Sequence, residues 1–276
     1  MLPTMSTATL PDLDTPYTLA PSQLDKYQRD GYVKLPNVLS GQTIEHYHGV
    51  VTEAVLSRAK HYKPLEQRDT YGKAFLQIGN LWTEDEGVKE LSFSRRLARI
   101  AAELMGCRGV RMYHDQALCK EAGGGFTPWH CDQQYWPLAT EKCVTAWIPL
   151  QAVPQEMGPL QFAQGSQHLV TGRDLAISDS SEAVMARTLA DCPKDETAFA
   201  LGDISFHAGW TFHRAGPNRT NRLRSVMTVI YMDIDMRLKA PETPGQASDT
   251  QSCCPNTKVG DIIASPINPV LWQANG

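Results

Sequence analysis

The chain has 276 residues, of which 26 are Lys or Arg and 30 are Asp or Glu, so its formal net charge is −4. This mild negative charge offers no electrostatic attraction to nucleic acid or to anionic lipid, and it disfavours a function that depends on binding polyanions. Hydrophobic residues make up 42% of the chain, a proportion typical of a folded globular protein, which excludes intrinsic disorder of the whole chain.

The N-terminal segment, residues 1–21, is rich in Pro, Thr and Ser and is expected to form a flexible arm. No Lys or Arg precedes Lys26, so the cationic start of a secretory signal is missing. The longest uncharged apolar run, Val226 to Met232, is far shorter than the ~18 residues that suggest a membrane span. The 7 cysteines form no C-x-x-C pair, which argues against a disulfide framework and a structural zinc site. We therefore expect a cytoplasmic protein with no membrane or nucleic-acid partner.

Helical patterns dominate the first third of the chain. Ser22 and Asp25 resemble a capping box, which predicts a short helix that ends before Gly31 and a strand over residues 32–36. A second helix is predicted from Ser40 to about residue 60, and a third is predicted to end at Gly106. The apolar residues that recur at helical spacing in these two helices are Ile44, Tyr47, Val51, Val55, Phe93, Leu97, Ile100 and Leu104.

Beyond Gly109 the pattern changes to the alternation typical of strands. Val110, Met112, His114, Gln116 and Leu118 are predicted to share one face of the first strand. Further strand-like runs, separated by turn-forming residues, cover 130–136, 143–153, 160–163, 198–207 and 224–233. Helices followed by many short strands predict a mainly β fold with flanking helices, either a β-sandwich or a jelly-roll barrel. The polar stretch from about 240 to 256 is expected to be a second mobile arm.

The segment Thr127-Pro-Trp-His-Cys-Asp132 contains a His-x-Asp pattern. On a strand, residues two apart point to the same face, so His130 and Asp132 are able to bind one metal ion while Cys131 points away. An imidazole and a carboxylate are two of the three ligands of the facial triad of non-haem Fe(II) oxygenases. The third ligand would be a histidine far downstream, and His207 and His213 are both candidates.

An arginine, Arg224, stands at the start of the apolar run 225–231. A buried guanidinium requires a carboxylate partner, and a bound dicarboxylate would supply one. The surrounding arginines, Arg214, Arg219 and Arg222, are expected to be solvated.

Taken together, His130-x-Asp132, Gly202-Asp203, His213 and Arg224 resemble the phytanoyl-CoA dioxygenase-like family of Fe(II)/2-oxoglutarate-dependent oxygenases. The resemblance extends from Tyr27 to about Asp233. It implies a double-stranded β-helix (jelly-roll, cupin-like) barrel in a single domain over residues 22–240, with residues 241–276 as a C-terminal extension and candidate lid.

The same resemblance implies the roles of individual residues. Iron would be held by His130, Asp132 and His213, Arg224 would pair with the far carboxylate of 2-oxoglutarate, and O2 would be the second cosubstrate. Three further side chains would line the cosubstrate pocket: Gln116, Trp147 and, by a looser match, Gln77. The chain departs from the family at Ala215, where many members have a hydroxyl, and near Phe75, where some have a lysine.

The residues after the motif, Gln134-Tyr-Trp-Pro-Leu138, resemble those of bacterial enzymes that tailor secondary metabolites. The implied reaction couples decarboxylation of 2-oxoglutarate to oxidation of an unactivated C–H bond, whose outcome is hydroxylation, desaturation, cyclisation or epimerisation. Halogenation is not expected, because Asp132 occupies the position that a halide would need. Four aromatic residues are candidates for an apolar substrate wall: Tyr135, Trp136, Trp210 and Phe212.

Two other classes of protein have some of these features. A non-redox cupin isomerase would use similar ligands for another divalent metal, but it has no need of a clamp such as Arg224. A metal-free β-sandwich binding module would keep the aromatic cluster without the ligands. In each case the expected partner is a small molecule, and the expected state is a monomer or a homodimer.

Overall fold

A computed structural model describes residues 11–274. Its helices are α1 (Pro21–Asp30), α2 (Gly41–Arg58), α3 (Thr70–Ala74), α4 (Glu86–Ser92), α5 (Arg95–Met105), α6 (Asp179–Thr188) and α7 (Pro244–Cys253). Its strands are β1 (Tyr32–Leu35), β2 (Leu76–Gly79), β3 (Gly109–Lys120), β4 (Thr127–His130), β5 (Cys143–Pro149), β6 (Leu160–Ala163), β7 (Lys194–Asp195), β8 (Ile204–Ala208), β9 (His213–Ala215), β10 (Arg224–Asp233) and β11 (Val270–Gln273). Short 3-10 turns lie between them, among them η5 (Asp132–Tyr135).

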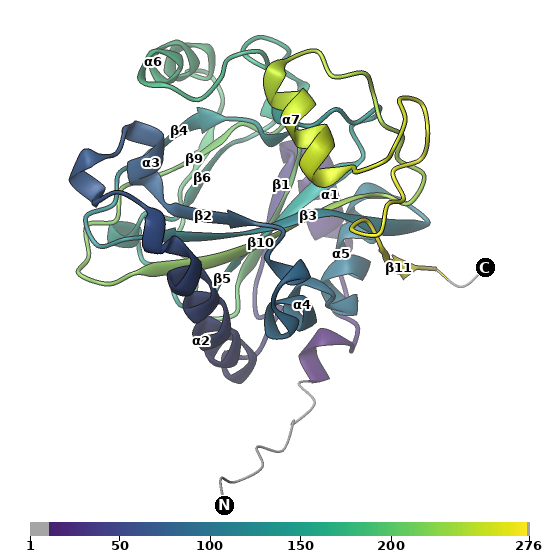
Figure 1. Cartoon of the computed structure of the whole chain (residues 1–276), viewed down its shortest axis with the longest axis horizontal. Coiled ribbons are helices and arrows are strands. Elements are labelled where there is room, and N and C mark those ends of the chain that lie inside the picture. Colours follow the sequence, from purple (N-terminus) through teal and green to yellow (C-terminus); the bar gives the residue numbers. More distant parts are fainter. Residues whose placement is uncertain (1–10, 275–276) are drawn as a thin grey trace, which may run out of the picture.

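The strands form two antiparallel sheets that face each other (Figure 1). The larger sheet has the order β1-β8-β5-β10-β3-β11, with β2 also paired to β3, and the smaller has the order β4-β9-β6-β7. This arrangement confirms the predicted jelly-roll fold. Within residues 11–274 no ladder of hydrogen bonds joins the two sheets, so the barrel is not closed by strand pairing.

Alternation along the central strands separates a helix-covered face from an inner face. Met227, Val229 and Tyr231 of β10 belong to the main apolar core, which the large sheet shares with α2, α4 and α5. The intervening residues of β10, including Arg224 and Thr228, face the space between the sheets. On the outside of the smaller sheet, α6 packs against β4, and Met185 contributes to a second apolar cluster there.

The predicted common face of residues 110–118 is wrong, because β3 contains a β-bulge. The pairing with β10 shifts between Ile230, opposite His114, and Tyr231, opposite Met112, so Tyr113 is an extra residue on β3. Because one extra residue reverses the alternation, Met112 lies in the helix-covered core while His114 lines the inner cavity. Val110, which was predicted to share the face of His114, also lies in that core.

The predicted helix ends are partly right. Ser40 caps α2 by accepting a hydrogen bond from Thr43 N, and α5 ends at Gly106, whose φ of 62° is the left-handed conformation that glycine favours. The capping box at Ser22 is wrong: α1 is capped at Ala20, and the Gln23 side chain accepts the hydrogen bond from its backbone N–H. The polar residues of this segment allow the helix to start at more than one position. Pro21 favours the earlier start, because proline suits the first turn of a helix.

Other differences concern polar segments. The run 130–136 is not one strand, because β4 ends at His130 and η5 follows; likewise only the end of 198–207 is strand, as β8. The expected arm around 240–256 contains α7, whose Gln246 side chain donates to Gln134 O in a buried hydrogen bond (2.9 Å). In the expected N-terminal arm, Asp12 Oδ2 accepts from Ser40 N (2.8 Å), while residues 1–10 lie outside the described part.

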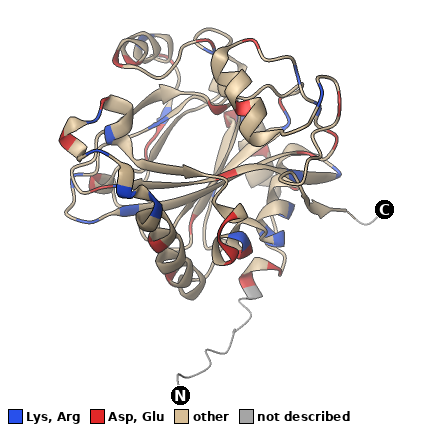
Figure 2. Cartoon of the chain, in the orientation of Figure 1, with Lys and Arg blue, Asp and Glu red and all other residues tan. Residues whose placement is uncertain are grey.

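Basic and acidic residues are interspersed along the elements (Figure 2). Among residues 11–274, no helix combines the length and apolarity that crossing a membrane requires.

Candidate metal centre

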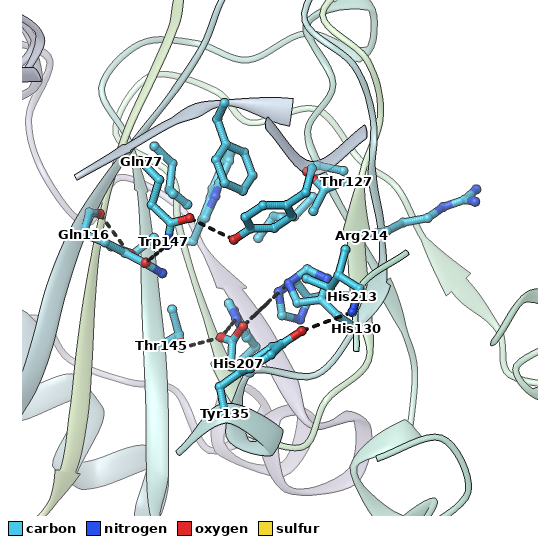
Figure 3. Close-up of a pocket in the computed structure, with 18 of the residues that line it drawn as sticks. Gln77, Gln116, Thr127, His130, Tyr135, Thr145, Trp147, His207, His213 and Arg214 are labelled. Carbon is cyan, nitrogen blue, oxygen red and sulfur yellow. Dashed lines mark hydrogen bonds and ion pairs between the residues drawn. The ribbon is translucent and has the colours of Figure 1, made fainter. Parts of the chain in front are cut away.

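A cavity of about 470 Å³ lies between the two sheets. Its walls come from the inner faces of β3, β5, β8 and β10 on one side and from β4 and β9 on the other, with additional residues from α3 and α7. Figure 3 shows three histidines and two glutamines around this cavity: His130, His207, His213, Gln77 and Gln116. The elements that supply them are far apart in the sequence, so only the sheet pairing brings them together.

Three metal-ligating side chains converge in the cavity. His130 ends β4, Asp132 opens η5, and His213 begins β9, where it lies directly opposite His130 in the strand pairing. Their candidate ligand atoms all lie within 4.8 Å of one another. Oδ1 of Asp132 is 3.7 Å from His130 Nε2 and 3.6 Å from His213 Nε2. The predicted triad is therefore assembled, although η5, rather than a continuous strand, presents the carboxylate.

The hydrogen bonds around the two histidines leave one nitrogen of each free. His130 Nδ1 faces Pro128 O at 2.8 Å and His213 Nδ1 faces Thr211 O at 3.0 Å. Because a carbonyl only accepts, each Nδ1 carries the proton and each Nε2 presents a lone pair toward Asp132. Burial lowers the pKa of both histidines to about 4, so both imidazoles are neutral at physiological pH.

The carboxylate of Asp132 is held in its charged form. Burial alone would raise its pKa, but the imidazoles of His213 and His207 hold the pKa well below the usual range. Thr145 Oγ1 also donates a hydrogen bond to Asp132 Oδ2 (2.9 Å). A half-buried anion between neutral imidazoles is a donor set that suits a divalent transition metal.

The rival histidine, His207, occupies a different position in the site. It projects from β8 and is 1% exposed, and its Nε2 lies 3.2 Å from Asp132 Oδ2. A carboxylate accepts, so the Nε2–H of His207 donates and this nitrogen has no lone pair for a metal. His207 thus orients Asp132, and its Nδ1 has no hydrogen-bond partner among the described residues.

Arg224 lies in the same cavity as a buried cation. It is 1% exposed, its Nη1 donates to Gly158 O, and its Nε has no hydrogen-bond partner in the described structure. No Asp or Glu of residues 11–274 forms an ion pair with it within 4.0 Å. Burial lowers the pKa of Arg224 to about 10, so it stays charged at neutral pH. An unpaired buried guanidinium with an unused N–H suits an anionic ligand.

The other predicted pocket residues lie nearby. Trp147 is buried, with its ring 5.6 Å from the guanidinium carbon of Arg224. Gln77 Nε2 donates to Gln116 Oε1, and Tyr71 OH donates to Gln77 Oε1 at 2.8 Å, so the two glutamines form a hydrogen-bonded wall (Figure 3). All three predicted residues line the cavity.

Thr127 is a cavity residue that the sequence interpretation missed. It lies opposite Ala215 in the pairing of β4 with β9, and its buried Oγ1 has no hydrogen-bond partner among the described residues. It therefore supplies a hydroxyl beside the position where the family often has one and this chain has Ala215. A shift in register between Thr127 and His130 lets residues three apart line the same cavity, which regular alternation does not predict.

The predicted aromatic wall divides into two pairs. Tyr135 and Trp136 line the cavity. Trp210 and Phe212 do not: Phe212 packs with the cluster under α6, and Trp210 stacks on Arg173, whose guanidinium carbon is 4.3 Å from its ring. Since Phe212 directly precedes His213, alternation places it on the opposite face of the sheet.

These features define a class of protein: a double-stranded β-helix protein in which a His-Asp-His group that could hold a metal ion shares a cavity with a buried cationic residue. The family model described as Phytanoyl-CoA dioxygenase (PhyH) matches residues 27–226. The chain belongs to this family. The protein is accordingly a non-haem Fe(II)- and 2-oxoglutarate-dependent dioxygenase, with O2 as the second cosubstrate.

Two characterised relatives match at low identity. Methylphosphonate hydroxylase of Gimesia maris is 23% identical over 216 residues, which cover 78% of this chain and 81% of the relative. L-proline trans-4-hydroxylase of Streptomyces griseoviridis is 26% identical over 156 residues, 55% of this chain and 56% of the relative.

Solved structures match over nearly the whole chain. The non-heme alpha ketoglutarate dependent carbocyclase SnoK from nogalamycin biosynthesis has a TM-score of 0.76 at 23% identity, covering 93% of this chain and 99% of its own. The epimerase SnoN, in complex with Fe3+, alpha ketoglutarate and nogalamycin RO, has a TM-score of 0.70 at 25% identity, with 91% and 98% covered.

Proposed function

We propose that His130, Asp132 and His213 bind Fe(II) as a facial triad, and that Arg224 binds the far carboxylate of 2-oxoglutarate. The observation that carries the proposal is the coexistence, in one cavity, of two free Nε2 lone pairs, a half-buried carboxylate and a buried guanidinium that has no ion-pair partner among residues 11–274. A three-residue facial set leaves adjacent sites for a chelating keto acid and for O2.

Bound Fe(II) supplies the redox chemistry: 2-oxoglutarate is decarboxylated to succinate with O2, and a C–H bond of the substrate is oxidised. The chain's own residues bind and orient the reactants. Arg224 and the Thr127 hydroxyl hold the carboxylate end of the keto acid, and Trp147 packs beside that end. His207 and Thr145 keep the Asp132 carboxylate in one orientation through their hydrogen bonds.

The substrate that we propose is a lipophilic small molecule, oxidised in the biosynthesis of a natural product. The cavity is bordered by Tyr135 and Trp136 and is large enough for a molecule of drug size. Support comes from SnoK and SnoN, which belong to nogalamycin biosynthesis and act as a carbocyclase and an epimerase. The hydroxylases among the relatives add hydroxylation to these candidate outcomes, and desaturation stays a prediction from the sequence.

Anaerobic addition of Fe(II) and then 2-oxoglutarate tests this proposal directly. We expect a visible metal-to-ligand charge-transfer band in the wild-type protein, and succinate formation after O2 is admitted. A non-redox metal-dependent isomerase or a metal-free binding module would give no such band.

Two histidine variants test the choice of ligands. His213→Ala is expected to lose the iron, whereas His207→Ala is expected to retain roughly one iron per chain, because His207 acts through Asp132. Loss of iron from His207→Ala with retention in His213→Ala would reverse the assignment.

A further inference from the structure

A second polar group lies in the cavity and has no role in holding iron or 2-oxoglutarate. It consists of His114, from the bulge of β3, and Asp249, from α7, and both side chains line the cavity wall. The bulge turns Tyr113 and His114 toward the same side, where Tyr113 OH donates to Asp249 Oδ2. The C-terminal extension thus contributes directly to the substrate side of the site.

Asp249 is a carboxylate without a cationic partner. No Lys or Arg of residues 11–274 lies within 4.0 Å of its oxygens, and the ring nitrogen of His114 nearest to it is within 4.8 Å but beyond ion-pair distance. Tyr113 OH and Cys253 Sγ (3.6 Å) donate to its two oxygens, but neither group is a cation. Among residues 11–274 the charge of this largely desolvated carboxylate therefore lacks an ion-pair partner, as does the charge of Arg224.

The ring of His114 adds a second hydrogen-bond acceptor. Its Nδ1 lies 3.2 Å from Asp115 O, a carbonyl that only accepts, so Nδ1 carries the proton and Nε2 presents a lone pair. An acceptor beside a carboxylate favours a ligand group with several N–H or O–H donors. Trp136 borders the same place, with its ring 5.8 Å from that of His114, and an aromatic ring adds attraction for a cation.

The strand register places this pair away from Arg224. Arg224 lies opposite Lys120 on β3, whereas His114 lies opposite Ile230, so about six strand residues, or roughly 20 Å, separate the two positions. Thr145, which contacts Asp132, lies on the other side of Ile230. Two strand spacings therefore separate His114 from Thr145, roughly 10 Å. A molecule held at Asp249 can extend across the cavity to the metal ligands.

A metal ion is the competing explanation, because Cys253 completes a His-Asp-Cys group. Cys253, however, is 5% exposed and does not line the cavity, and its Sγ donates a hydrogen bond to Asp249 Oδ1 (3.6 Å). A protonated thiol is a poor metal ligand. The geometry favours an organic donor instead.

We propose that Asp249, with His114 beside it, binds a protonated amine of the substrate, so that the substrate class is a lipophilic amine whose ammonium group is anchored on the Asp249 side of the cavity that also holds the proposed iron ligands. This inference rests on the proposed function, because it assigns the anchoring group for the molecule that is oxidised.

Paired probes that differ only in charge test the proposal. Dansylcadaverine and tryptamine each carry an ammonium group, whereas their N-acetyl derivatives are neutral. Fluorescence measures the binding of each probe to the full-length protein in the presence of 2-oxoglutarate. In the wild-type protein we expect at least one amine to bind tenfold or more tightly than its acetylated partner, and we expect Asp249→Asn to abolish the preference. Equal affinity within both pairs, or no binding by either amine, overturns the proposal.

Matched variants separate charge from packing. Tyr113→Phe removes the hydrogen bond to Asp249 but keeps the carboxylate, so it should keep the preference for the amine. Asp235→Asn, at an exposed acid paired with Arg108, should have no effect. If Asp249→Asn does not fold, His114→Gln is the replacement variant, and it should reduce the preference at least threefold. The charge-transfer band with Fe(II) and 2-oxoglutarate should persist in Asp249→Asn; its absence from wild type would refute the proposed function instead.

Discussion

At the scale of single residues, the cavity is marked by buried polar atoms whose hydrogen-bonding capacity the fold leaves unused. Arg224 Nε and Thr127 Oγ1 have no partner in the described structure, and both belong to side chains that line the cavity. Leaving such groups unpaired costs free energy, so they are commonly retained for a ligand. The two side chains project from different sheets, so a ligand that bonds both of them, as we propose for 2-oxoglutarate, would lie between the sheets.

Replacing Arg224 by Ala should weaken the binding of 2-oxoglutarate. Losing one partner of a buried charge pair typically costs ~2–5 kcal/mol, which corresponds to about a thirtyfold or greater rise in Kd. Isothermal titration of the anaerobic Fe(II) protein with 2-oxoglutarate measures this. Arg222→Ala, at an exposed arginine two residues away, should bind normally. An unchanged Kd in Arg224→Ala would assign the clamp to another residue.

Thr127→Val tests the hydroxyl separately from the side-chain shape. One neutral hydrogen bond is worth ~0.5–1.5 kcal/mol, so the Kd of 2-oxoglutarate should rise roughly 2- to 12-fold, while Thr127→Ser should stay close to wild type. The melting temperature of the ligand-free protein should not fall, because Thr127 Oγ1 bonds no other described residue. Wild-type affinity in Thr127→Val would remove this hydroxyl from the site.

At the scale of elements, helix caps and bulges determine which side chains meet. The bulge in β3 delivers His114 to the cavity, and the ordered packing of α7 against η5 brings Asp249 to the same wall. On the opposite face of the large sheet, α5 packs on β3 and β5. Its N-terminus is fixed by Ser94, whose Oγ accepts from Leu97 N and donates to Leu13 O.

Ser94→Ala should destabilise the protein by about 1 kcal/mol, within the ~0.5–2 kcal/mol range for a lost N-cap. Urea unfolding followed by circular dichroism gives the change in free energy. Ser248→Ala, at an exposed position of α7, should stay within ~0.5 kcal/mol of wild type. Equal stability of the two variants would argue against the capping role of Ser94, and neither change should alter the binding of 2-oxoglutarate.

At the scale of the whole molecule, a fully buried lysine links the large sheet to two loops. Lys120 ends β3, and its Nζ donates to Gly125 O and to Gly216 O (2.8 Å). Burial, assisted by the nearby Arg224, lowers the pKa of Lys120 to about 6 from 10.5. The unfolded chain therefore binds more protons than the folded chain between these pH values, and Lys120 makes stability rise with pH across that window.

Lys120→Met should reduce this pH dependence. When the pH is lowered from 9.5 to 6.5, the free energy of unfolding should fall more for the wild type than for Lys120→Met. The reason is that only the wild type has a lysine that is protonated in the unfolded chain and must lose its proton, or be buried as a cation, on folding. Thermal or urea unfolding at the two pH values provides the difference. A uniform offset between the two proteins, with the same slope against pH, would show that Lys120 does not titrate in this range.

The sequence by itself determined the motif residues, the strand over residues 224–233 and the caps at Ser40 and Gly106, because these depend on neighbouring residues. It did not predict that η5 would present Asp132, or that the polar segment after residue 240 would form α7.

Only the tertiary structure decided which histidine presents a free Nε2 toward Asp132, since the Nε2 of His207 already donates to that carboxylate from a distant strand. It also decided that Thr127 stands opposite Ala215 and that a bulge turns His114 toward Asp249. These features depend on strand register and on contacts between distant segments. A one-residue shift in register reverses the face of every following side chain, and no local pattern in the sequence records it.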